Sequence, residues 1–127
     1  MTKPRFPLRF DPKKTQGHYV LIGKLAVPEP DLLKWAEWFE KSSVDDSRIV
    51  ARTQVGGILI STVFLALDHS FNFSNDPEIL PILFETMAFK GGKGDDTWRC
   101  GTWEEAEAQH AAAVAQVRAE IKDKVNK

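Results

Sequence analysis

The sequence contains little cysteine, little net charge and no long apolar run. Its single cysteine, Cys100, rules out a disulfide within the chain and fits a reducing compartment, by default the cytosol. The 17 Lys and Arg against 18 Asp and Glu give a formal charge of −1, which argues against a nucleic-acid coat protein. The longest apolar stretch, residues 58–67, includes Ser61 and Thr62 and is far shorter than a membrane span. Residues 1–14 lack the apolar core of a secretory signal, so we expect neither export nor a membrane anchor.

The length of the chain, 127 residues, suits one folded domain. A domain of this size buries roughly two-thirds of the surface that its unfolded chain exposes, enough to fold without a disulfide or a structural metal. We expect residues 1–17 to form a basic, proline-rich arm and residues 18–127 to form a single domain. The first fourteen residues contain five Lys or Arg, one Asp and three Pro, and proline disfavours a helix and a central strand.

The first part of the domain predicts a strand and then a helix. Residues 18–22 form a short β-rich run that Gly23 ends. Apolar residues then recur at the three- and four-residue spacing of a helix face, at Leu32, Trp35, Ala36 and Phe39. With Asp31 as the N-cap, this spacing predicts an amphipathic helix over residues 32–42.

Two β-rich runs around a pair of glycines predict a tight hairpin. The runs are residues 48–55 and 58–67, joined by Gly56-Gly57, and the primed turns of tight hairpins need positive φ. Counting outward from the turn predicts the pairs Val55 with Ile58, Thr53 with Ile60, Arg52 with Ser61 and Ala51 with Thr62. The second strand is apolar on both faces from Val63 to Leu67, which predicts a central strand covered on one side by helices and on the other by a loop or a second subunit.

The second half of the chain predicts two more strands and a long helix. A polar connection over residues 68–78 leads to a third strand over 79–89, and a glycine-rich turn leads to a fourth over 97–100. Thr102 and Glu105 then form a capping box. One face of the following helix holds Trp103, Ala106, His110, Ala113, Val114, Val117 and Ile121. We therefore predict an α+β fold: an antiparallel meander of four or five strands with two helices packed on one face.

Polar residues of the strands are the candidates for a site. His69 follows the apolar strand next to Asp68, where a sheet can present an imidazole for proton transfer, but adjacent strand residues point to opposite faces. A catalytic role and a role at a strand end or interface both stay open. Glu85 interrupts an apolar strand and needs a donor such as Arg52, Arg99 or His69. Such a pair could be a structural ion pair or half of a polar site.

Metal, cofactor and nucleophile motifs are absent from the sequence. The three histidines include no pair at i, i+4 and there is no cysteine cluster, so we expect no metal and no cofactor. His110, on the inner face of the last helix, is better explained as a hydrogen-bonded core residue. Cys100 has no evident histidine or cationic partner, and we expect it to be a small core residue.

Two further features could bind a partner. The arm places Phe6 and Phe10 among its cations, which could hold a nucleic-acid backbone and stack on bases; the cations could equally pair with an acidic protein surface. Trp38 lies off the centre line of the first helix's apolar face, so we expect it at an interface or a pocket rim.

Four segments carry a resemblance to a known group of proteins. They are Trp35-Ala-Glu-Trp-Phe-Glu40, Ile60-Ser-Thr-Val-Phe-Leu-Ala-Leu-Asp-His69, Leu83-Phe-Glu-Thr-Met87 and Thr102-Trp-Glu-Glu-Ala106. In that order they resemble small uncharacterised proteins encoded by bacteriophages and prophages, over residues 18–118. The resemblance implies a phage accessory protein in the cytoplasm of the bacterial host, and it carries no known catalytic residue. The connection over residues 71–76 departs from the glycine- and proline-rich stretch expected of such relatives.

Two functions follow from these observations. The first is a binding protein that acts on a host component, such as an inhibitor of an anti-phage defence system that blocks a protein surface or sequesters a nucleotide signal. Its candidate binding residues are Trp38, Arg52, Asp68, His69, Glu85 and Arg99, and self-association is expected. The second is a small hydrolase or transferase that uses His69 and Glu85 on the sheet.

Overall fold

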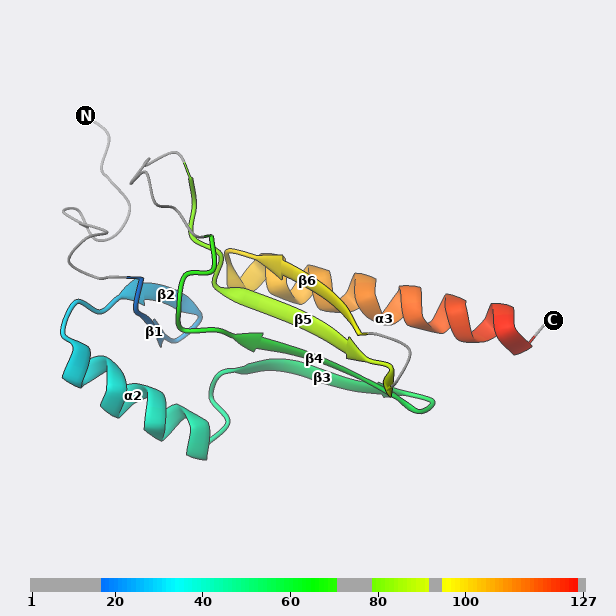
Figure 1. The fold of residues 1–127 in the computed structure, drawn as a ribbon, viewed down its shortest axis with the longest axis horizontal. Helices are drawn as coiled ribbons and strands as arrows, with labels where there is room; N and C mark the ends of the chain where they lie inside the picture. The colour runs from blue at the N-terminus through cyan, green and yellow to red at the C-terminus, as the bar shows by residue number, and fades with distance from the viewer. Residues whose placement is uncertain (1–16, 71–78, 92–94, 126–127) are drawn as a thin grey trace. The chain divides into compact units, whose positions relative to one another are not determined.

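The computed structural model describes residues 17–70, 79–91 and 95–125, and its contacts form two compact units (Figure 1). Unit 1 contains the chain up to Arg48 together with Leu65–Leu83, and unit 2 contains Ile49–Phe64 and the chain from Phe84 onward. The predicted arm, apart from Gly17, lies outside the described residues. The single domain over residues 18–127 stays a prediction.

Unit 1 begins with a two-stranded antiparallel sheet. Strand β1 (Tyr19–Ile22) confirms the predicted run, and β2 (Leu25–Pro28), which we did not predict, pairs with it across a turn at Gly23. Glu29 N donates to His18 O beside the last pair. Because the bonds of an antiparallel pair alternate, the missing N–H of Pro28 falls where the strand faces away from β1.

Helix α2 (Leu32–Val44) confirms the predicted helix and its cap. Asp31 Oδ1 accepts hydrogen bonds from Leu33 N at 3.0 Å and Lys34 N at 3.2 Å. Trp35 Nε1 donates to Tyr19 O at 3.0 Å and Ala66 O at 3.3 Å, which ties α2 to β1 and to the segment after β4. The prediction placed both helices on one sheet face, whereas α2 packs against β1 inside unit 1.

Unit 2 is a four-stranded antiparallel meander backed by one helix, and it confirms the predicted α+β fold. Its strands are β3 (Ile49–Val55), β4 (Ile58–Phe64), β5 (Phe84–Phe89) and β6 (Asp96–Cys100), in that order across the sheet. In Figure 1, α3 (Trp103–Val125) runs along these strands. All four predicted pairs of the β3–β4 hairpin are confirmed.

The turn of this hairpin uses Gly56 in the left-handed region, at a φ of +58°, with an added Cβ 3.4 Å from Ile121 Cδ1. We expect Gly56→Ala to lower the free energy of unfolding by about 1–2 kcal/mol, because a side chain is strained at this φ. Gly57→Ala is the matched control, since its φ is not positive and its Cβ would meet open space. Urea denaturation of both variants measures the difference, and equal losses would contradict the explanation.

Strands β4 and β5 are shorter than predicted. We expected strands over 58–67 and 79–89, but β4 ends at Phe64 and β5 begins at Phe84. Ala66 adopts a positive φ of 67°, which an extended strand does not allow. Beyond Pro81, Ile82 N donates to the Asp68 carboxylate instead of to a neighbouring strand.

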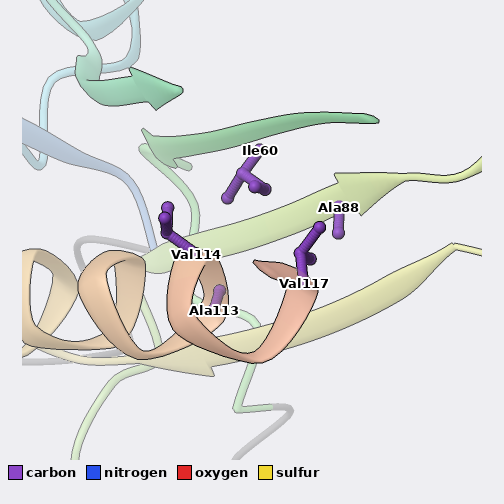
Figure 2. Close-up of a cluster of buried hydrophobic side chains, with 5 residues drawn as sticks. All are labelled: Ile60, Ala88, Ala113, Val114 and Val117. Carbon is purple, nitrogen blue, oxygen red and sulfur yellow. The ribbon is translucent and has the colours of Figure 1, made fainter. Parts of the chain in front are cut away.

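Helix α3 covers one face of the sheet. Its predicted capping box is confirmed, because Glu105 N donates to Thr102 Oγ1 at 3.1 Å and Thr102 N donates to Glu105 Oε1 at 3.2 Å. The predicted apolar stripe lies against the sheet. Figure 2 shows the centre of this core, formed by Ile60 of β4, Ala88 of β5 and Ala113, Val114 and Val117 of α3.

In the part of the chain that the structure describes, no helix combines the length and the apolar character needed to span a membrane.

Candidate functional site

The partner of Glu85 in the structure is Arg99. The two residues pair directly across β5 and β6, and Arg99 Nε lies 3.0 Å from Glu85 Oε2. The glutamate side chain is 17% exposed and the arginine side chain 43% exposed, so the ion pair sits at the surface of the sheet. Arg99 is one of the three donors that the sequence proposed for Glu85.

Both residues belong to the sheet face that points away from α3, which we call the open face. Side chains alternate along a strand, and the residues between those of the α3-packed core therefore point to this side. No described element of unit 2 covers them. The open face consists of Arg52, Gln54, Leu59, Ser61, Val63, Glu85, Met87, Phe89, Thr97 and Arg99.

The open face has an apolar centre and cationic margins. Leu59 pairs with Phe89, and Ser61 pairs with Met87, so apolar side chains lie next to one another on the two central strands. Phe89 is 42% exposed, so part of its ring is available at the surface of the open face. Arg52, opposite Ser61 on β3, is exposed and has no ion pair with any described residue.

Asp68 forms hydrogen bonds with backbone groups of unit 1. Its Oδ1 accepts from Ser70 N at 2.8 Å and from Ile82 N at 2.9 Å, and its own N–H donates to Gly17 O. Burial, together with the Asp68 charge, raises the pKa of Tyr19 far above its ordinary value. Asp68 therefore joins three segments of the unit through backbone hydrogen bonds.

His69 also contacts the backbone. Its Nδ1 lies 2.8 Å from Leu67 O, and since a carbonyl oxygen only accepts, Nδ1 carries the hydrogen. Nδ1 is therefore not the atom that could act as a base. Asp68 and His69 belong to unit 1, whereas Arg52, Glu85 and Arg99 belong to unit 2.

Trp38 borders a hollow in unit 1 of about 370 Å³, which it shares with Leu21, Lys41 and Asp45. Two polar side chains that line this hollow are bonded within the protein. Asp45 Oδ1 accepts from Ser47 N, and Ser42 Oγ, also in the lining, donates to Phe39 O.

Outside the open face, the described residues show neither a reactive thiol nor a group of metal ligands. Burial raises the pKa of the Cys100 thiol, which keeps it protonated and weakly nucleophilic. Among residues 17–70, 79–91 and 95–125, no three His, Cys, Asp or Glu side chains lie together as metal ligands would. Phe6 and Phe10, proposed for nucleic-acid binding, lie outside the described residues.

The sequence predicted His110 as a hydrogen-bonded core residue, and the structure confirms this and adds its partners. His110 is 7% exposed, and its Nδ1 and Nε2 lie 2.7 Å from Thr62 Oγ1 and 2.8 Å from Thr53 Oγ1. Thr62 Oγ1 lies 2.6 Å from Thr86 Oγ1, which accepts from Gln109 Nε2 at 3.1 Å. Sequence analysis did not find this network. Its only signal was threonine at strand positions that otherwise carry apolar residues toward α3.

The fold and the open face define an α+β protein with a helix on one side of its main sheet and a mixed apolar and cationic surface on the other. Comparisons of this chain with models of protein families, with curated proteins and with solved structures found no match.

Proposed function

We propose that the protein is a binding protein whose open face recognises a surface of another protein. The observation that carries this proposal is the exposed aromatic residue Phe89 among Leu59 and Met87, flanked by Arg52. Aromatic and methionine side chains bordered by arginine are enriched in protein interfaces. The resemblance to phage-encoded proteins suggests that the partner is a component of the bacterial host, such as part of a defence system.

The charges of the open face indicate the chemistry of the partner. Its described residues carry two arginines and one glutamate, and Glu85 is already paired with Arg99. Arg52 is the remaining positive charge, at the margin of the apolar centre. A partner with an apolar patch and an adjacent carboxylate fits this arrangement, because it would pair Arg52 while covering Phe89.

A protein partner is favoured over a nucleotide signal. A nucleotide needs several donors that converge on its phosphates. On the open face the Arg99 guanidinium is engaged by Glu85, and Arg52 lies on a different strand. The second function from the sequence, a hydrolase or transferase that uses His69 and Glu85, has less support, since Glu85 is held in an ion pair with Arg99.

The test is capture from bacterial lysate by immobilised full-length protein, followed by mass spectrometry of proteins and small molecules. We expect Phe89→Asp and Arg52→Glu each to reduce retention of the partner at least tenfold, because each places a negative charge where the partner is apolar or acidic. Ala112→Asp, which adds the same charge at an exposed position of α3, is the matched control and should retain the partner.

Circular dichroism establishes that each variant is folded, and the exposure of Phe89 and Arg52 makes folding the expected result. Equal retention by Phe89→Asp and Ala112→Asp would overturn the proposal. A nucleotide recovered with the wild-type protein and lost with Arg52→Glu would replace it with signal sequestration.

A further inference from the structure

His110 connects α3 to two strands through both of its ring nitrogens. The hydroxyl groups of Thr62 and Thr53 hold Nδ1 and Nε2, and only 7% of the histidine is exposed. We infer that His110 makes the packing of α3 on the four-stranded sheet sensitive to acid, because the imidazole fits this network only in its neutral form.

The hydrogen-bond directions follow from the ends of the network. The amide nitrogen of Gln109 can only donate, so Thr86 Oγ1 accepts from it. If the Thr86 hydrogen points to Thr62 and the Thr62 hydrogen points to His110, then Nδ1 accepts and Nε2 donates to Thr53.

The opposite direction is less favourable. It would leave the hydroxyl hydrogen of Thr86 without an acceptor in the network, and Thr86 is fully buried. In the direction described above, the hydroxyl hydrogen without an acceptor in the network is that of Thr53, and Thr53 is partly exposed. In neutral His110 the hydrogen is therefore on Nε2.

A second proton on His110 breaks this order. An imidazolium donates from both nitrogens, so Nδ1 can no longer accept from Thr62. The Thr62 hydrogen must turn toward Thr86, whose own hydrogen then loses its acceptor in the buried network. Protonation therefore adds a buried charge and an unpaired buried hydroxyl at the same place.

No nearby charge offsets the cost. Within the described residues that pack with α3, Arg52 of β3 and Glu85 of β5 point to the open face, and β4 has no titratable residue. On β6, the Cys100 thiol is oriented toward Thr102 O. On α3 itself, Glu107 lies one turn before His110 and is exposed.

Two further carboxylates, of Asp96 and Glu120, are already held in ion pairs. Asp96 of β6 and Glu120 of α3 both accept from Lys90 Nζ. In agreement with this arrangement, burial lowers the pKa of His110 below its ordinary value of 6.5.

The sign of the pH effect follows from proton counts. Between the lowered pKa and pH 6.5 the unfolded chain binds a proton at His110 that the folded chain does not bind. The contribution of His110 to the free energy of unfolding is therefore constant above about pH 7. Below pH 6.5 the free energy of unfolding falls as the pH decreases.

The test uses the full chain at pH 7.5 and pH 5.5. Nitrogen NMR of the ring should show Nε2 protonated and Nδ1 bare at pH 7.5. Hydrogen exchange, corrected for intrinsic rates, measures the protection of the α3 amides. From pH 7.5 to pH 5.5 this protection should fall about fivefold to tenfold more in the wild type than in His110→Gln. His69→Gln, which changes a histidine of unit 1, is the control and should behave as the wild type.

A ring that titrates at or above pH 6.5 would overturn the inference, and so would equal losses of protection in the wild type and His110→Gln. If His110→Gln does not fold, the ring titration of the wild type decides the question alone.

Discussion

Phe84→Ala is expected to lower the free energy of unfolding by about 3–5 kcal/mol, the range for deleting a fully buried aromatic side chain. Phe84 is 0% exposed, at the start of β5. Its ring centroid lies 5.2 Å from that of Phe64 and 6.2 Å from that of Trp103, which meets it edge to face. The substitution would leave a cavity between β4, β5 and the first turn of α3, and both neighbouring rings would lose contacts.

Urea denaturation followed by tryptophan fluorescence and circular dichroism measures this effect. Phe89→Ala is the matched control, since the same side chain is removed from the same strand at a position that is 42% exposed. We expect the control to lose less than about 1 kcal/mol, because no cavity forms at a surface position. Similar losses in the two variants would show that Phe84 does not occupy the core.

The parts of the fold that sequence analysis predicted correctly depend on local chemistry. The Gly56-Gly57 turn determined the β3–β4 register, because a two-residue turn leaves one way of counting outward. The capping box at Thr102 and the N-cap at Asp31 act on backbone groups within three residues. Such features need no knowledge of the rest of the chain, and each is confirmed.

The parts that were missed depend on contacts between distant residues. Strand β2 consists of only four residues and ends at Pro28, and its identity as a strand comes from pairing with β1. Strand β4 ends early because Ala66 has a positive φ, and alanine at this position gives no sequence signal for that conformation. Ala66 O also accepts from Trp35 Nε1, a partner 31 residues away in the sequence.

The candidate site was predicted only in part, because its pairings also depend on contacts between distant residues. A carboxylate in an apolar strand needs a donor, so Glu85 identified a polar pair, but only the β5–β6 register selects Arg99 among three candidates. The register also places Arg52 on the same face. The network around His110 requires three threonines from three strands and one helix face, and no local pattern contains that information.

Trp35→Ala is expected to lower the free energy of unfolding by about 3 kcal/mol, the lower end of the range for tryptophan because Trp35 is only partly buried. Its ring stacks on Phe39 with centroids 4.8 Å apart and meets His18 at 4.6 Å. Trp35→Phe keeps most of the ring but leaves the carbonyls of Tyr19 and Ala66 without the indole donor, so a loss of about 1 kcal/mol is expected.

Leu33→Ala is the control on the same helix, since Leu33 is 76% exposed and should change stability by less than about 0.5 kcal/mol.

The same series also tests whether residues 18–127 unfold as one domain. Trp35 belongs to unit 1 and Phe84 to unit 2. In a single cooperative domain each substitution lowers the protection of slowly exchanging amides in both units, because these amides exchange only through global unfolding. Protection that falls only in the substituted unit would mean that the two units unfold separately.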